Sequence, residues 1–239
     1  VGQRTAELSQ ANRDLAAEVD RRQRVEEALR HAHQELEQRV EARTAALNAA
    51  VDALRSENAV RASAEAAARL DEARLEALLR LGQMTDASLQ SITEFSLEEG
   101  VRLTKSRIGY LAFMNEDESV LSMHAWSKTA MKQCAIEDKP LLYPVKSTGL
   151  WGEAVRQRKP VITNDYAAPS PLKKGHPEGH VPITRHMNVP IFEGARIVAV
   201  AGVGNKEEPY DESDVRQLTL VMQGMWRLVQ RLRADERIQ

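Results

Sequence analysis

The stretch Asn188-Val-Pro-Ile-Phe-Glu-Gly-Ala-Arg-Ile-Val-Ala-Val-Ala-Gly-Val-Gly-Asn205 decides the fold. It predicts two apolar strands joined by a turn at Glu193-Gly194, because Val, Ile and Phe cluster between turn-forming residues. From Ile197 to Val203 both alternating sets of positions are apolar, so both faces of this strand are expected to be covered. We therefore place it at the centre of a sheet. Gly202 and Gly204 leave its far end bare, which lets another backbone or a ligand approach closely.

The composition divides the chain into a rod and a globule. All ten aromatic residues lie at Phe95 or later, and all nine prolines lie at Pro140 or later. Up to Glu94 the only glycines are Gly2 and Gly82. A segment without aromatics, prolines or many glycines is typical of one long helix rather than of a globular core.

Charge and hydropathy exclude several classes of protein. The first 94 residues hold 13 Arg against 17 acidic residues, and the remainder holds 20 basic against 18 acidic residues. Neither half has the basic excess of a nucleic-acid-binding protein. The longest apolar run, Ile197 to Val203, is too short to span a bilayer, and no signal peptide is recognisable. Cys134 is the single cysteine, so no internal disulfide forms, and a reducing compartment is expected.

The rod, residues 1–80, carries apolar residues at alternating spacings of mostly three and four, the seam of a coiled coil. The register slips near Val19–Val25 and Leu36–Val40, and a pattern beginning at Val1 returns at Val40, an internal repeat of 39 residues. Such a rod needs a partner for its seam, so we predict a parallel homodimer. The repeat is interpreted either as a duplicated spacer or as a switchable coil with two packings of similar energy.

A helix is predicted to begin near Asp211 and to lead out of the globule. Its apolar residues follow a strict heptad seam: Val215, Leu218, Met222, Met225, Val229 and Leu232. We interpret this helix as a second dimer contact leading to an output domain beyond Gln239. The alternative is a helix packed only on its own sheet.

Residues 81–233 predict an α+β domain with a mostly antiparallel sheet and a helix at each end. Apolar patterns indicate a helix ending at Ser106, followed by six strands, two of them in the central hairpin. The segment 165–186, with four prolines and two glycines, is long enough to indicate a lid or a binding loop.

The chain from about residue 75 to 232 resembles a GAF domain. The resemblance rests on the helix ending at Ser106, Gly109-Tyr-Leu-Ala-Phe, Gly149-Leu-Trp-Gly-Glu-Ala-Val155 before Pro160-Val-Ile-Thr-Asn-Asp165, Val189-Pro-Ile191, and Tyr210-Asp-Glu-Ser-Asp214. It is most similar to the GAF domains of bacterial sensor histidine kinases and related multidomain regulators. The resemblance implies a central antiparallel sheet with a small-molecule pocket roofed by the segment between Trp126 and His186.

Candidate ligand-binding residues lie in segments that a GAF domain wraps around its pocket. His124 and Trp126 are expected to share one face of their strand. Aromatic rings with a few hydrogen-bonding groups suit a small planar or carboxylated ligand, with Arg185 as its charge partner. The interpretation that the tryptophans are plain core and Arg185 is solvated stays open. The predicted set is His124, Trp126, Trp151, Asn164, Tyr166, His180 and Arg185.

Metal and thiol chemistry is weighed and not favoured. His176, Glu178, His180 and His186 are close in sequence, but their spacing matches no compact metal motif. Nothing around Cys134 matches the bilin attachment motif of some GAF domains, and a single cysteine argues against methionine sulfoxide reduction. We therefore predict no metal, leave the cofactor unknown, and expect no catalytic site in this region.

Together these patterns predict a cytoplasmic sensory module of a signal-transduction protein, in which a bound small molecule shifts dimeric helices. The chain opens at a valine, so the full protein is expected to be longer, with an output domain such as a histidine kinase and possible membrane segments elsewhere. No nucleic acid and no direct membrane insertion are expected. The alternative function is a ligand-free dimerisation module or spacer within a sensor kinase.

Overall fold

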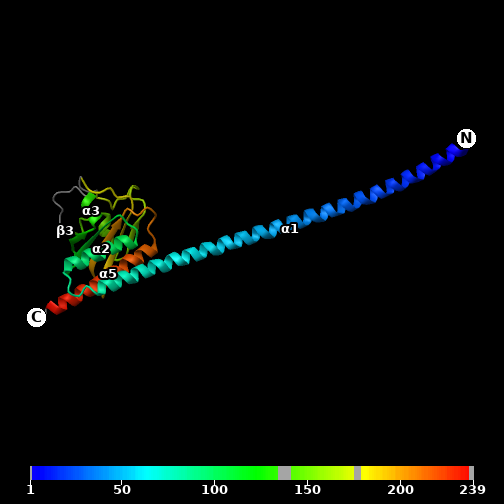
Figure 1. Ribbon diagram of the computed structural model, residues 1–239. Coiled ribbons are helices and arrows are strands. Elements are labelled where there is room, and N and C mark those ends of the chain that lie inside the picture. The colour runs from blue at the N-terminus through cyan, green and yellow to red at the C-terminus, as the bar shows by residue number, and fades with distance from the viewer. Residues whose placement is uncertain (1, 134–140, 175–178, 237–239) are drawn as a thin grey trace. The chain divides into compact units, whose positions relative to one another are not determined.

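The computed structural model describes residues 2–133, 141–174 and 179–236, with residues 2–7 and 236 described by their backbone alone. The chain divides into two compact units, residues 1–66 and 67–239. The ribbon shows a long helix and a sheet covered by shorter helices (Figure 1). Within the described residues, no helix combines the length and the apolar composition needed to cross a membrane.

The helix α1 runs from Gly2 to Gly82 without interruption. The sequence permits this because residues 3–81 contain neither proline nor glycine. Up to Ala66 its described side chains are almost all exposed, and intrahelical ion pairs such as Arg61 with Glu65 (2.8 Å) line its surface. The apolar positions of the predicted seam are exposed as well: Leu8, Leu15, Val19, Val25, Leu29, Leu36, Val40, Leu47 and Leu54.

The second unit contains the end of α1 and an α+β domain, which confirms the predicted fold class. The elements after α1 are α2 Leu89–Leu103, β1 Ile108–Met114, β2 Val120–Trp126, α3 Lys128–Gln133, β3 Leu142–Pro144, a 3₁₀ turn η1 Leu150–Gly152, α4 Glu153–Arg156, β4 Val161–Thr163, β5 His186–Glu193, β6 Arg196–Gly204 and α5 Glu212–Glu236.

The sheet has the strand order β3-β2-β1-β6-β5-β4, and every neighbouring pair is antiparallel. The predicted hairpin is confirmed: β5 and β6 pair through a turn in which Gly194 has φ +58°, a conformation that glycine adopts without strain. The strand β6 lies between β1 and β5, at the centre of the sheet, as its two apolar faces predicted.

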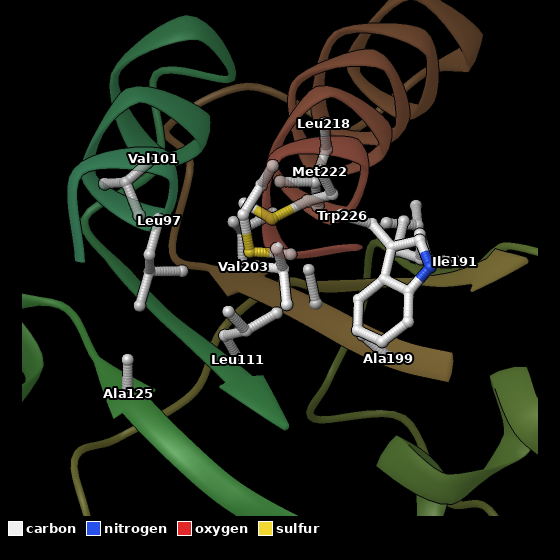
Figure 2. Close-up of a cluster of buried hydrophobic side chains, with 14 of the residues drawn as sticks. Leu97, Val101, Leu111, Ala125, Ile191, Ala199, Val203, Leu218, Met222 and Trp226 are labelled. Atoms are coloured by element: carbon white, nitrogen blue, oxygen red, sulfur yellow. The ribbon is translucent and has the colours of Figure 1, made fainter. Parts of the chain in front are cut away.

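One face of the sheet is covered by α2 and α5, and the main hydrophobic core lies between them (Figure 2). Leu97 and Val101 of α2 contribute to this core, together with Leu218, Met222 and Trp226 of α5. They meet a layer of small and branched side chains from four strands: Leu111, Ala125, Met187, Val189, Ile191, Val198, Ala199, Ala201 and Val203. Alternation along each strand supplies most of this layer, because every second residue points to the same face. Val198 joins its neighbour Ala199 in the layer because the pairing of β5 and β6 shifts between Ile191 and Phe192.

The predicted dimer contact through the α5 seam is wrong. Leu218, Met222 and Met225 are fully buried in the domain's own core, and Val229 is 1% exposed. The seam is therefore not available to a second chain. The buried stripe of α5 is broader than the seam, as expected of a core-facing helix, because Val221, Trp226 and Leu228 are buried as well. Val221 packs with Leu103 of α2 and with the end of α1.

The last turns of α1 belong to the α+β domain. Ala77 and Leu81 are each 2% exposed, and Arg74 Nη1 donates to Gln217 Oε1 of α5 at 3.1 Å. Leu78 Cδ2 lies so close to Gly224 of α5 that a Cβ there would meet it at 2.6 Å. A side chain at Gly224 would therefore force the Leu78 side chain to shift.

Candidate functional site

The sheet face opposite α2 and α5 carries a row of residues in cross-strand register. Asn188 on β5 pairs with Gly202 on β6, Gly202 pairs with Tyr110 on β1, and Tyr110 pairs with Trp126 on β2. Residues that pair across strands point to the same face. A parallel row one step along the sheet contains His186, Gly204 and Ile108. These two rows are called the strip below.

Hydrogen bonds join three segments across the first row. The hydroxyl of Tyr110 donates to Asn188 Oδ1 at 2.7 Å, and Asn188 Nδ2 donates to the carbonyl oxygen of Trp151 at 2.8 Å. The ring of Trp151 stands edge-on to Tyr110 and to Tyr143, with centroid distances of 5.7 and 4.8 Å. Burial raises the pKa of Tyr110, although the hydrogen bond to Asn188 opposes the shift. Tyr110 is therefore a neutral donor at physiological pH.

Gly202 is the position that allows this arrangement. A Cβ there would lie 2.2 Å from Cε1 of Tyr110 and 2.3 Å from Oδ1 of Asn188. No side chain fits in that space. The side chains of Tyr110 and Asn188 therefore pack over the bare backbone that was predicted at this end of β6.

The second row presents a buried histidine. His186 is 8% exposed, and its Nδ1 atom has no hydrogen-bond partner among the residues that the structure describes. Burial lowers the pKa of His186 to about 4, and the neighbouring Asn188 side chain offsets part of that effect. Tyr166 stands edge-on to this imidazole at 6.3 Å between ring centroids. His186 is therefore neutral at pH 7 and presents an unused polar atom.

Trp126 and His180 belong to the same end of the domain. Trp126 packs against a small cluster that contains Ile108, Val181 and Ile183, so the segment after residue 179 covers it. Nδ1 of His180 lies 2.7 Å from the carbonyl oxygen of Val181. Both side chains are partly buried.

His124 points to the other face of the sheet. The register of β1 and β2 shifts between Leu111 and Ala112, where Ala125 pairs with the first and Met123 with the second. This bulge leaves His124 unpaired, and its ring lies 4.7 Å from Phe113, which packs on the core under α5. The expectation that His124 and Trp126 share one face is therefore wrong, because a bulge interrupts the alternation on which it relied.

Asn164 and Arg185 hold the segment that leads into α5. Asn164 Oδ1 accepts from the backbone N–H of Tyr210 at 2.7 Å, and its Nδ2 donates to the Tyr210 carbonyl at 2.9 Å. Arg185 Nη1 donates to the carbonyl oxygen of Lys206 at 3.2 Å. Nearby, Lys206 Nζ contacts Asp214 Oδ2 at 2.6 Å in a largely buried ion pair. These bonds tie β4 and β5 to the start of the last helix.

The strip contains residues that the sequence prediction left out. Tyr110 and Asn188 appeared only as parts of apolar strands, and His186 only as a possible metal ligand. One signal was present: a polar or aromatic residue on each neighbouring strand lies in register with a glycine of the central strand. Reading that signal requires the strand order and register, which the sequence does not supply.

No group of three or more His, Cys, Asp or Glu side chains suited to a metal ion occurs within residues 2–133, 141–174 and 179–236. Of the residues weighed for metal binding, His180 and His186 are placed, whereas His176 and Glu178 lie outside the described residues. Cys134 lies outside them as well.

Comparison with known proteins identifies a family that shares this architecture. The family model described as "GAF domain" matches residues 86–230, more than half of the chain. The "Methyl sulfide methyltransferase-associated sensor" of Methanosarcina acetivorans is 67% identical over 176 residues, which cover 74% of this chain. Those residues span only 18% of that relative's length.

Solved structures share the fold at low sequence identity. The GAF domain of a phosphoenolpyruvate-protein phosphotransferase from Coxiella burnetii has a TM-score of 0.55 at 16% identity, covering 68% of this chain and 96% of its own. A free methionine-R-sulfoxide reductase from Neisseria meningitidis has a TM-score of 0.53 at 14% identity, covering 70% and 93%. The family match and the shared fold lead to one conclusion: the chain belongs to the GAF-domain family.

Proposed function

We propose that this chain is the sensory module of a signal-transduction protein and that it binds a small molecule on the strip. The observation that carries the proposal is His186, whose Nδ1 atom is buried and lacks a hydrogen-bond partner among the described residues. An unpaired buried polar group costs about 1–3 kcal/mol, so it is a site that a ligand would satisfy. Membership of the GAF family and the relative named as a sensor support the sensory role.

The chemistry of the strip favours a planar ligand without a formal charge. A neutral imidazole both donates and accepts hydrogen bonds, and Tyr166 supplies an aromatic ring next to it. Trp126 lies on the same face of the sheet but on β2, so that β1 and β6 separate its strand from β5. The predicted charge partner, Arg185, donates from Nη1 to the carbonyl oxygen of Lys206, whereas its buried Nε has no hydrogen-bond partner among the described residues. Its part in binding stays a prediction.

Ligand binding would act on the helices through the segment that begins α5. Tyr166, next to His186, lies two residues after Asn164, whose amide holds the backbone of Tyr210 from both sides. A ligand that moves this segment changes the position of α5, and its effect is limited by its difference in affinity for the two helix arrangements. A difference of about 1.4 kcal/mol changes the ratio of the two arrangements tenfold.

The test compares native and denaturing mass spectra and an absorbance scan of protein purified without chelator. We expect the native spectrum to show mass in excess of the polypeptide. The denaturing spectrum should lack this excess if the ligand is bound non-covalently and keep it if the ligand is bound covalently. Metabolites identified in this way, or by a thermal-shift screen, should raise the melting temperature of the wild type but not that of His186→Phe or Trp126→Ala. His31→Phe, on the exposed surface of α1, is the matched control and should keep the full shift. An equal shift in all four proteins would remove the strip as the ligand site.

A second function is a ligand-free spacer, and one observation favours it. Trp151, Tyr110 and Asn188 close part of the strip with the domain's own side chains. This function predicts polypeptide mass alone and no stabilisation by any compound in a metabolite screen.

The proposal includes a parallel homodimer formed through α1, a cytoplasmic location, no catalytic activity in this region, and an output domain such as a histidine kinase in the full protein. The dimer rests on the exposed apolar seam of α1, which a second copy would bury. Sedimentation equilibrium of the whole chain tests it, and a monomer across micromolar concentrations would refute it.

A further inference from the structure

Four side chains gather where the last turns of α5 lie against the sheet. The ring centroid of Phe113 on β1 lies 4.7 Å from that of His124 on β2 and 5.9 Å from that of Trp226, which projects from α5 towards the sheet (Figure 2). The guanidinium carbon of Arg233 lies 5.1 Å from the ring centroid of Trp226 and 5.9 Å from that of Phe113. His124, Phe113, Trp226 and Arg233 are called the clasp below.

The clasp helps to hold the end of α5 on the domain. A guanidinium group over an aromatic face is attracted by the negative charge density of the ring, and Arg233 has two such rings. In the same turns, Leu232 packs on the main core and Gln230 Nε2 donates to Glu193 of the β5–β6 hairpin. Because Arg233 is exposed to solvent, its attraction to the rings is modest, and a new positive charge nearby can offset it.

His124 is the member of the clasp that can change its charge near neutral pH. Its ring is partly buried, and its Nε2 atom is buried without a hydrogen-bond partner among the described residues. Burial lowers the pKa of His124 below the ordinary value of 6.5, the negative charge of Glu94 on α2 opposes this shift, and the positive charge of Arg233 adds to it. The imidazole is therefore neutral at pH 7, and the clasp is built around the neutral form.

Protonation of His124 would disturb the clasp in two ways. Both ring nitrogens of an imidazolium are donors, so the buried Nε2–H would have no acceptor in its present place. The new positive charge would also repel Arg233 of α5 and attract Glu94 of α2. Both effects favour an arrangement in which the imidazole turns to water or to α2 and Arg233 leaves the aromatic rings.

We propose that His124 is a proton-binding site that releases the last turns of α5 from the sheet when the pH falls. Since the folded clasp favours the neutral imidazole, closure is complete above about pH 6.5 and is lost progressively below it. The inference goes beyond the proposed function because it needs no ligand on the strip, which lies on the other face of the sheet. His124 would make the exit helix respond to acid, independently of ligand binding.

Proton NMR titration of the histidine rings in the full chain tests the charge relation. The protein has six histidines, and His124→Gln identifies the signal that belongs to His124. Arg233→Met should raise the pH midpoint of this signal because it removes a repelling charge, and Glu94→Gln should lower it. Arg231→Met is the matched control, because Arg231 is a largely exposed cation of the same turn that pairs with Asp235 within the helix, and it should leave the midpoint unchanged. A midpoint that does not respond to Arg233→Met would overturn the inference.

Hydrogen exchange followed by mass spectrometry at pH 7.5 and pH 5, corrected for the intrinsic effect of pH on exchange, tests the release. Between these pH values the amides of residues 228–236 should accelerate at least about fivefold more than those of β6, the lower end of the effect of an unsatisfied buried polar group on an opening equilibrium. His124→Phe and His124→Gln cannot take up the proton and should lose this difference, whereas His186→Gln should keep it.

Two outcomes of the exchange experiment would overturn the inference. Equal acceleration of residues 228–236 and of β6 would mean that acid weakens the whole domain and not the end of α5. A difference that persists in both His124 variants would mean that another group binds the proton. Neither measurement involves a ligand, so a failure here leaves the proposed ligand site on the strip untouched, and a failed metabolite screen leaves the clasp untouched.

Discussion

The hydroxyl of Tyr110 donates to Oδ1 of Asn188 at 2.7 Å, across the bare backbone of Gly202. The two residues lie 78 positions apart in the chain and on strands that are not neighbours. Their contact is possible because the central strand between them has no side chain at that point. The contact between Tyr110 and Asn188 therefore depends on Gly202.

Gly202→Ala should lower the free energy of unfolding by about 1–3 kcal/mol, because the new methyl group would overlap Tyr110 and Asn188 and force both to move. Urea unfolding followed by circular dichroism measures it. Gly82→Ala is the matched control: nothing lies within 4 Å of the Cβ position there. Its effect should stay within about 0.5 kcal/mol, and equal effects of the two substitutions would contradict the packing around Gly202.

Tyr110→Phe should also destabilise the domain. It leaves Oδ1 of the fully buried Asn188 without its donor, which costs about 1–3 kcal/mol. Tyr166→Phe removes a hydroxyl that has no hydrogen-bond partner among the described residues, and it should change the free energy of unfolding by less than about 0.5 kcal/mol. A Tyr110→Phe protein as stable as the wild type would show that the bond contributes nothing.

The burial of the α5 seam predicts how its substitution behaves. Met225→Ala should cost about 2–5 kcal/mol in the free energy of unfolding, because it leaves a cavity in the core. Leu220→Ala, on the outer side of the same helix and 36% exposed, should cost much less. Unfolding curves measure the loss of stability, and sedimentation velocity shows whether either substitution changes the oligomeric state. If Met225→Ala kept full stability and instead dissociated a dimer, α5 would be an interface after all.

His186 makes stability depend on pH. Its pKa is near 6.5 in the unfolded chain and about 4 in the folded domain, so between these values the unfolded state binds the extra proton. Stability is therefore complete above pH 6.5, falls as the pH drops towards 4, and loses on the order of 3 kcal/mol from this group. The burial of His124 lowers its pKa as well and adds to the same trend.

The pH dependence is checked by urea unfolding at several pH values between 4 and 7.5. His186→Gln should flatten the slope between pH 6.5 and 4, whereas His31→Gln, exposed on α1, should leave it unchanged. An unchanged slope in His186→Gln would show that this imidazole is not buried in its neutral form.

The sequence by itself determined the features that depend on local pattern. A stretch without internal proline or glycine gave one helix, α1, and two apolar faces from Ile197 to Val203 placed β6 at the centre of the sheet. Turn-forming residues at Glu193-Gly194 set the hairpin. These predictions succeeded because backbone conformation and alternation along one strand are governed by neighbours in the chain.

Only the tertiary structure decided which surfaces cover which faces. The seam of α5 has the spacing of a coiled coil. Periodicity shows that one face of a helix is apolar, but it does not show which surface buries that face. In this domain the sheet buries it. A one-residue bulge turned His124 to the face opposite Trp126, and the strand register brought Tyr110 and Asn188 together over Gly202. Bulges and register arise from pairing between strands distant in sequence, so a local reading of the chain does not contain them.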